Sequence, residues 1–265
     1  MRIFRKLNHA LRLNIIKTLY FNFKVLPFRQ AMKLPFFLYG RVFLWDLSGK
    51  VIIEEENLRR GMIRIGYKWF DLWPTSFLPT QIQVLGTMVF KGAAVFSGGT
   101  NVNVQSKDGK LILGKNVVIG GGSVCKCLEY IEVGDMTAIT GNCTIMDCNM
   151  HFVKNLDSGV VANYKGPIKI GARCWINAGS IVSKGAVIPD YCISARNAYL
   201  SKDYSEYGTN LLLVGSPAKP TSSKVQRIFT AEKQREFREF FEANETQVLQ
   251  LEPGLEIETG MREGF

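Results

Sequence analysis

Units of six residues recur through the middle of the chain, and they constrain the fold more than any other feature. From Val84 the sequence divides into blocks such as VLGTMV, FKGAAV and FSGGTN, followed after an interruption by VGDMTA, ITGNCT and IMDCNM. A second interruption, residues 152–167, precedes IGARCW, INAGSI, VSKGAV, IPDYCI and SARNAY. The first position of a block is mostly Val, Ile, Leu or Phe, and the second and fourth are often Gly or another small residue.

A period of six fits neither an α-helix, which repeats every 3.6 residues, nor a plain strand, which repeats every two. It fits a short strand followed by a tight turn, with three such units closing one triangular coil of about eighteen residues. The aliphatic side chain then points inward and stacks on its equivalent in the next coil, while Gly, Asn and Asp tolerate the turns at the corners. The sequence therefore predicts an all-β fold, a parallel β-helix of roughly six coils over residues 82–202.

The remaining segments flank this β-helix. Residues 1–45 contain nine of the 33 Lys/Arg and none of the 23 Asp/Glu, and apolar residues recur in them at helical spacing. We expect this segment to be helical and basic, and residues 46–81 to hold irregular strands that start the solenoid. Residues 82–221 form the β-helix domain, with residues 152–167 as a loop leaving the coil, and residues 222–265 form a C-terminal helix and tail.

The basic N-terminal segment attracts phosphate groups. Residues 1–20 are predicted either to lie as an amphipathic helix on an anionic membrane or to pack on the coil or a neighbouring subunit. No aromatic-interleaved motif accompanies the basic residues, so nucleic-acid binding is not expected. No segment reads as a signal peptide, and we expect a cytoplasmic protein, with peripheral contact at the inner face of the cell membrane as the open alternative.

The cysteines and histidines limit the chemistry. The six cysteines show no CxxC spacing, so we expect them reduced and buried, with no metal site. His151, within TIMDCNMHFV, is one of two histidines in the chain and the only one in the repeats. Histidine is the side chain suited to act as a general base near neutral pH. Asp147, four residues earlier, is predicted to bond its other ring nitrogen and fix the tautomer.

A structural role for these residues stays an alternative. A lone histidine in a solenoid can simply be satisfied by its neighbours, and Asp147 and Asn149 can be turn residues. The position of His151 at the last block before an interruption favours catalysis. Cys148, beside it, is disfavoured as a nucleophile because no second imidazole is available to activate it.

Four motifs together carry a family resemblance: the hexads, MDCNMH, the Trp of CWINAG and the closing GSPAKP. They resemble the left-handed β-helix (hexapeptide-repeat) acyltransferases, and most closely the acetyltransferases of bacterial capsule, lipopolysaccharide and exopolysaccharide synthesis. The resemblance covers residues 82–221. It implies a left-handed coil, a homotrimer, acetyl-CoA as co-substrate, and a histidine base in a cleft between two subunits.

The resemblance also assigns residues. Asp147 and His151 match the catalytic positions, and Asn149 stands where the family usually has a second Asp near the acceptor. The loop position itself, and not the resemblance, makes Tyr164 and Lys165 candidates for acceptor binding, with solvation of the loop as the alternative. The candidates for coenzyme contact are Trp175, Ala178, Gly179, Ser180, Ser194, Ala195 and Lys219. Trp175 as a cap of the core and Lys219 as a solvated charge remain alternatives.

The predicted function is therefore acetyl-CoA-dependent acetylation of a sugar hydroxyl in bacterial surface polysaccharide synthesis. The acceptor would be a sugar, a glycan or a lipid-linked glycan, and the transfer is direct, with His151 as the base. N-acetylation of a nucleotide-linked amino sugar and a non-catalytic scaffold are the alternatives. A β-helix carbonic anhydrase is excluded, because its metal needs three histidines and the repeats contain one.

Overall fold

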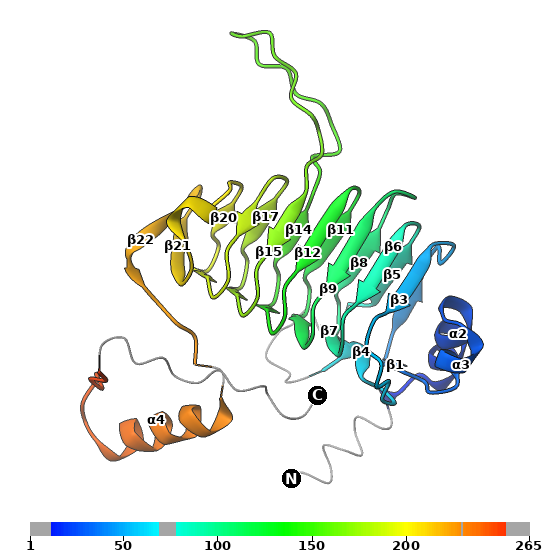
Figure 1. Ribbon diagram of the computed structural model, residues 1–265, viewed down its shortest axis with the longest axis horizontal. Helices are drawn as coiled ribbons and strands as arrows, with labels where there is room; N and C mark the ends of the chain where they lie inside the picture. The colour runs from blue at the N-terminus through cyan, green and yellow to red at the C-terminus, as the bar shows by residue number, and fades with distance from the viewer. Residues whose placement is uncertain (1–11, 69–77, 229, 253–265) are drawn as a thin grey trace.

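Parallel strands wind into a three-sided coil in the computed structural model, which describes residues 12–68, 78–228 and 230–252 (Figure 1). From β1 to β20 every third strand belongs to the same sheet, so consecutive strands lie on different faces of the coil. The strands pair in parallel on all three faces, apart from the last pair of the first face. This arrangement confirms the predicted parallel β-helix built from three short strands per turn.

The three faces are named here by their order along the chain. Face 1 contains β1 (Phe36–Leu38), β4 (Ile63–Tyr67), β7 (Ala94–Ser97), β10 (Val117–Ile119), β13 (Ala138–Ile139), β16 (Trp175–Ile176), β19 (Ile193–Ser194), β21 (Leu211–Gly215) and β22 (Ala218–Lys224). Face 2 contains β2 (Val42–Leu44), β5 (Thr80–Val84), β8 (Asn101–Val104), β11 (Val124–Cys127), β14 (Thr144–Met146), β17 (Ile181–Ser183) and β20 (Tyr199–Leu200). Face 3 contains β3 (Lys50–Ile53), β6 (Thr87–Phe90), β9 (Lys110–Leu113), β12 (Tyr130–Val133), β15 (Ile168–Ile170) and β18 (Val187–Ile188).

The first residue of each hexad supplies the core. Inward side chains lie directly over their equivalents one coil away, as the register of face 2 shows. Five successive members of this column are buried, and they are Val102, Cys125, Ile145, Val182 and Leu200. Stacking of this kind removes apolar area from water continuously along the axis, at about 25 cal/mol per Å². The coil is therefore a rigid support for whatever leaves it.

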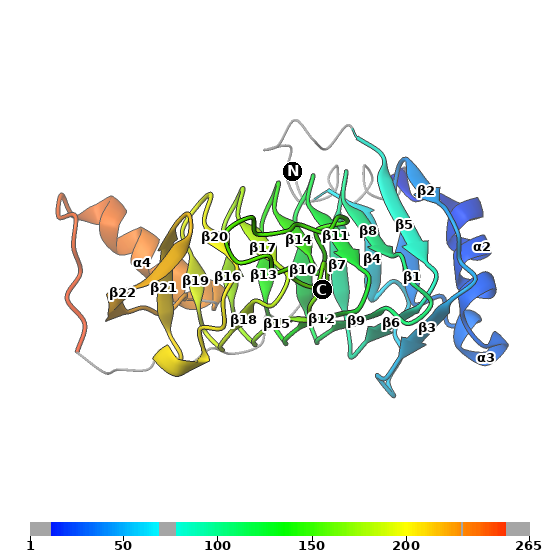
Figure 2. The ribbon, with the colours of Figure 1, turned by 90° about the horizontal axis from the view of Figure 1, so that it is seen from above.

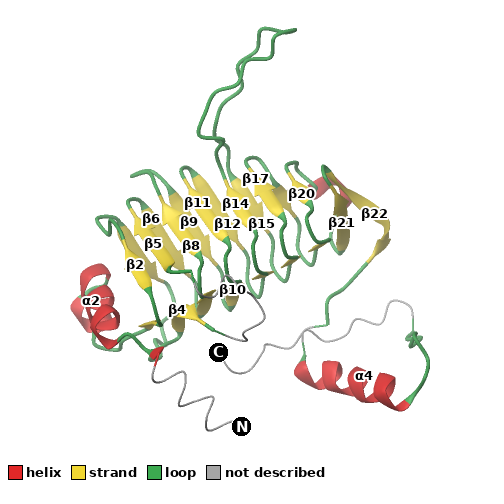
Figure 3. Ribbon diagram, turned by 180° about the vertical axis from the view of Figure 1, so that it is seen from behind, coloured by secondary structure: helices red, strands yellow, loops and turns green. Residues whose placement is uncertain are grey.

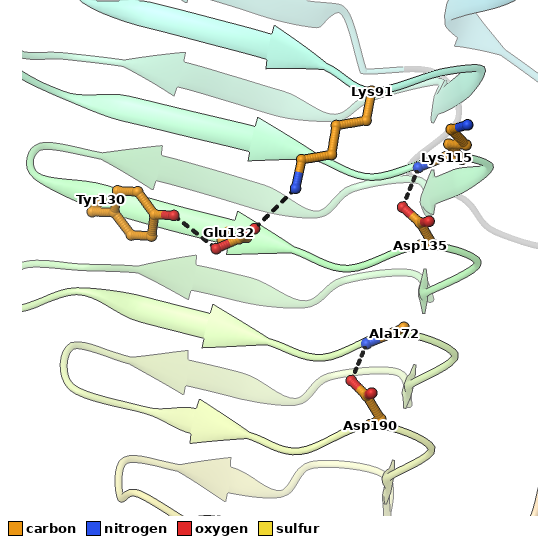
Figure 4. A network of polar contacts seen from close by, with 7 residues as sticks. All are labelled: Lys91, Lys115, Tyr130, Glu132, Asp135, Ala172 and Asp190. Atoms are coloured by element: carbon orange, nitrogen blue, oxygen red, sulfur yellow. Dashed lines mark hydrogen bonds and ion pairs between the residues drawn. The ribbon is translucent and has the colours of Figure 1, made fainter. Parts of the chain in front are cut away.

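Polar side chains secure the corners. Asp135 and Asp190 lie at the edge between face 3 and face 1 (Figure 4). Their carboxylates accept hydrogen bonds from the backbone N–H groups of Lys115 and Ala172 in the preceding coil, both at 2.7 Å. Each bond satisfies a donor that the tight turn leaves without a strand partner.

Helices cap the N-terminal end of the coil. Helix α2 (Ile15–Val25) and the short α3 (Phe28–Ala31) lie beyond the first coil (Figure 2). Strands β1 and β2 fall within residues 1–45, which were expected to be helical, so the solenoid starts at Phe36. The reason is a period-two pattern in which Phe36 and Leu38 are buried on either side of half-buried Phe37. Residues 1–11, which hold most of the segment predicted to contact a membrane, lie outside the described residues.

The C-terminal end also differs in detail from the expectation. Strand β22 turns back antiparallel to β21, so residues 218–224 extend face 1, although a helix and tail were expected from residue 222 on. After the single turn η2 (Ser205–Tyr207) and this hairpin, helix α4 (Ala231–Ala243) lies apart from the coil (Figure 3). None of the helices in the described part of the chain is long and apolar enough to cross a membrane.

Candidate active site

A two-stranded arm, residues 147–167, leaves the coil at the edge between face 2 and face 3 and projects far from it (Figure 1). Its base is closed by two backbone hydrogen bonds, from Asn149 N–H to the Tyr164 carbonyl at 2.7 Å and from Gly166 N–H to the Asp147 carbonyl at 2.9 Å. Further out, Asn155 closes the tip with an N–H bond to the Val160 carbonyl. The chain thus leaves the coil just after β14, earlier than the predicted loop, and His151 lies on the arm itself.

Four of the predicted site residues meet at the base of this arm. His151 and Asn149 are exposed on the outgoing strand, and Tyr164 and Lys165 are half-buried on the returning strand. The backbones of Lys165 and Cys148 form an isolated antiparallel β-bridge. The Tyr164 ring packs edge-on against Phe152, with 5.0 Å between ring centroids. The two facing segments at the base of the arm thus carry an exposed imidazole, an amide, a phenol and an ammonium group, which are groups that can hold a sugar.

Asp147 lies at the root of the arm, but its partners are not those predicted. Its fully buried carboxylate accepts hydrogen bonds from three successive backbone N–H groups of the neighbouring coil. Leu128 donates to both oxygens, at 2.8 and 3.0 Å, while Glu129 and Tyr130 donate to Oδ2 at 2.7 and 2.9 Å. Within the described chain no hydrogen bond joins Asp147 to His151. The carboxylate therefore anchors the arm, and its acceptor sites are filled by the turn beneath.

The anchored turn is tied to face 3 by a polar network (Figure 4). The Tyr130 hydroxyl donates to Glu132 at 2.7 Å, and Lys91 approaches the same carboxylate at 3.2 Å. The hydrogen bond from Tyr130 lowers the pKa of Glu132, with Lys91 adding to the effect. Burial, together with the neighbouring Glu132, raises the pKa of Tyr130 to about 12. The phenol therefore stays protonated at neutral pH and helps to hold the turn on which the arm rests.

The predicted coenzyme residues gather elsewhere, along face 1 and the edge between face 1 and face 2. Ser180 and Ser194 are buried, their hydroxyls 3.0 Å apart, and Ser180 also donates to the Ala195 carbonyl at 3.1 Å. The Asn177 N–H donates to Ser194 Oγ at 2.8 Å. Ala178 is buried between these residues. Both serine hydroxyls thus join successive coils, which leaves backbone groups of this edge as the candidates for a pantetheine chain.

Gly179 is needed at this edge for two reasons. Its φ of +75° is disfavoured for residues with a side chain, and a Cβ there would lie 2.0 Å from Asn197 Oδ1. The corners of adjacent coils are therefore stacked closely at this edge.

Trp175 and Lys219 lie on face 1, toward the C-terminal end. The Trp175 indole is half-buried, and the guanidinium of Arg227 lies 4.7 Å from its ring centroid. The indole N–H is buried and has no hydrogen-bond partner among the described residues. Lys219 is exposed on β22. Sequence reasoning missed Arg227, because nothing in its neighbourhood marks a cation that folds back over β16.

The predicted site is thus divided between two edges of one chain. The catalytic and acceptor group lies between faces 2 and 3, and the coenzyme group lies on face 1 and between faces 1 and 2. A single coil cannot bring both edges together, because the packed interior separates them. Within one chain the predicted catalytic residues and the predicted coenzyme residues therefore lie apart.

The cysteines are free and buried, as predicted. Burial raises the pKa of Cys125 to about 12 and that of Cys143 to about 11. Burial also raises the pKa of Cys148, which argues against a thiolate nucleophile beside His151. Within residues 12–68, 78–228 and 230–252, no group of three or more His, Cys, Asp or Glu is placed to hold a metal ion.

Several solved acyltransferase structures are similar to this chain. They include the polysialic-acid-specific acetyltransferase NeuO (15% identity, TM-score 0.42, covering 80% of this chain and 94% of that one). The N-acyltransferase AntD from Bacillus cereus has 11% identity and a TM-score of 0.39, and covers 78% of this chain and 88% of its own. A maltose O-acetyltransferase from Clostridium difficile 630 has 20% identity and a TM-score of 0.33, and covers 61% and 81%.

No protein-family model matches the sequence, and a search of curated proteins finds no match.

Proposed function

We propose that this protein is an acetyl-CoA-dependent acetyltransferase that acts on a sugar hydroxyl of a bacterial surface polysaccharide, with His151 as general base. The observation that supports this most strongly is the position of His151. It is the one imidazole of the repeats, and it stands exposed on an arm whose root is fixed to a rigid coil by Asp147.

The reaction needs few groups. His151 takes the proton of the acceptor hydroxyl as its oxygen attacks the thioester carbon of acetyl-CoA. The tetrahedral intermediate collapses by breaking the C–S bond, and the imidazolium returns its proton to the departing thiolate of coenzyme A. A backbone N–H group in the cleft stabilises the oxyanion. Asp147 acts as a positioning residue, through the arm and not through the imidazole.

The division of the site between two edges supports a homotrimer, in which each arm reaches the coenzyme edge of the next subunit. Three equivalent sites then form at three equivalent interfaces, as closed cyclic symmetry requires. Tyr164, Lys165 and Asn149 contact the acceptor from the arm, while Trp175 and Lys219 contact the coenzyme from face 1 of the neighbour.

Release of free thiol from acetyl-CoA in the presence of capsule or lipopolysaccharide glycans tests the activity. We expect turnover by the wild type and a loss of at least about 100-fold in His151→Ala, the range for a missing general base. His9→Ala, which removes the other histidine, is the matched control and should retain full activity. Full activity of His151→Ala would exclude the mechanism. Turnover with nucleotide-linked amino sugars alone would move the acceptor from a hydroxyl to an amine.

Mixed assemblies test the shared site. His151→Ala and Trp175→Ala are expected to be impaired when each is assembled alone. In randomly mixed trimers about a quarter of all sites should contain both an intact His151 and an intact Trp175. The reason is that each site combines the arm of one subunit with the coenzyme edge of another. No recovery on mixing would place both groups of residues in one chain.

A further inference from the structure

Helix α2 turns its apolar side away from the protein. At about 100° per residue, Ile15, Ile16, Leu19, Tyr20 and Phe23 share one continuous side of the helix, and all five are exposed, Ile16 by 82%. An amphipathic helix of a soluble domain normally buries this side against the core.

The opposite side of α2 already makes the contacts that hold the helix to the coil. Phe21 is buried against Phe36, with 5.0 Å between ring centroids. Thr18 Oγ1 accepts a hydrogen bond from the Leu38 N–H at 3.0 Å, and the Asn22 amide both accepts from the Phe36 N–H and donates to its carbonyl. The helix is therefore fixed in an orientation that leaves its apolar side without a partner within the described chain.

The short helix α3 enlarges this surface, which we call the cap surface. It comprises the exposed side chains of Ile15, Ile16, Leu19, Tyr20, Phe23, Phe28 and Met32. Phe28 is 70% exposed and Met32 60%, and the Phe28 ring lies 5.9 Å from that of Phe23. The cap surface lies at the blunt end of the coil, beyond β1 and away from the arm (Figure 2).

Positive charge predominates beside the cap surface. Lys24, Arg29 and Lys33 are exposed there, and residues 1–45 contain no Asp or Glu. The carboxylate of Asp46 interacts with Lys24 and offsets part of this charge. A second copy of the same surface would be repelled by this charge, because end-to-end contact places like charges together. An anionic lipid surface offers the complement on both counts, since its acyl region accepts apolar side chains and its headgroups attract lysine and arginine.

We propose that the cap surface docks this protein peripherally onto an anionic membrane, with the apolar side of α2 inserted at the headgroup boundary. The helix lies in the plane of the membrane, and the coil stands on it by its N-terminal end. Such binding combines partial apolar insertion with electrostatic attraction, so it is reversible and salt-sensitive.

Vesicle co-sedimentation of the full chain tests the proposal. We expect binding to vesicles that contain phosphatidylglycerol, weaker binding at high salt, and none to phosphatidylcholine alone. Combined substitution of Lys24, Arg29 and Lys33 by Gln should weaken partitioning about a hundred-fold. The apolar variant Ile16→Gln/Leu19→Gln/Phe23→Gln should weaken it at least about ten-fold.

Matched controls place the same substitutions elsewhere. Lys107, Lys110 and Lys202 replaced by Gln remove three exposed charges far from the cap, and Leu156→Gln/Val160→Gln removes exposed apolar groups on the arm. Both controls should bind as the wild type does, and circular dichroism verifies the fold of every variant. Failure of the wild type to bind phosphatidylglycerol vesicles would overturn the proposal, as would equal loss in the controls. Self-association that the apolar variant abolishes, without vesicle binding, would assign the cap surface to a second copy.

Discussion

Replacement of Asp147 by Asn tests whether this residue anchors the arm or acts as the catalytic partner of His151. The carboxylate accepts from three backbone N–H groups, at 2.7 to 3.0 Å, while fully buried. The amide keeps one acceptor oxygen, which can still serve Glu129 and Tyr130. Its NH₂ group then faces the N–H of Leu128, which loses its acceptor.

The cost follows from these contacts. Hydrogen bonds to a charged group contribute about 1.5–3 kcal/mol each and neutral ones about 1 kcal/mol, and an unsatisfied buried donor costs about 1–3 kcal/mol. Two weakened bonds and one orphaned donor therefore reduce the free energy of unfolding by roughly 2–7 kcal/mol. Asp190→Asn is the matched control, because Asp190 is exposed and accepts a single backbone bond. It should cost about 1 kcal/mol.

The assay is urea unfolding of both variants, followed by circular dichroism, with acetyl transfer measured on the same samples. We expect the unfolding midpoint of Asp147→Asn to fall well below that of Asp190→Asn, and limited proteolysis to cut the arm faster. Equal midpoints would refute the anchoring role. A large loss of turnover with an unchanged midpoint and an intact arm would instead make Asp147 the partner of His151.

Two further predictions concern the coil. Gly179→Ala should destabilise the protein more than Gly185→Ala by about 1–3 kcal/mol in thermal unfolding, because both have positive φ but only the Cβ at Gly179 meets Asn197. An equal loss of stability in the two variants would show that Asn197 moves aside at little cost. Because burial raises the pKa of Cys125 to about 12, the unfolded state deprotonates first, so stability present below about pH 8.5 falls as pH rises toward about 12. The urea midpoint of the wild type should therefore drop between about pH 8 and 10, and that of Cys125→Val should drop less. An identical change of the midpoint with pH in both proteins would contradict the raised pKa of Cys125.

The regular part of the fold could be predicted because its signal repeats. One aliphatic side chain per hexad recurs often enough to reveal the coil, and strand pairing such as that of Val124 with Thr144 preserves the register. Strands β1 and β2 were not predicted because each has only three residues and no hexad frame precedes them. Their position became clear only through pairing with β4 and β5, which lie far along the chain.

The candidate site was predictable in part. The break in the repeats located His151 and the arm, since an interruption marks the point where the chain leaves the coil. The partners of Asp147 were not predictable, because its carboxylate contacts a turn seventeen to nineteen residues away. Spacing along the chain suggested His151 as the partner, whereas stacking of coils brought Leu128 to Tyr130 closer. Arg227 over Trp175 arises in the same way, from a segment that folds back on face 1.

The capped coil also fixes the distance between the cap surface and the arm. On face 2, four steps separate β2, next to the cap, from β14, at the root of the arm. At about 4.8 Å per strand, the root of the arm that carries His151 stands roughly 19 Å from the first coil, along the axis. A chain docked by its cap would therefore work at a set height above the lipid, and would select acceptors by how far their reactive sugar extends from the membrane. Adding or deleting one coil would change that height by about 4.8 Å and shift which sugar along a glycan is reached.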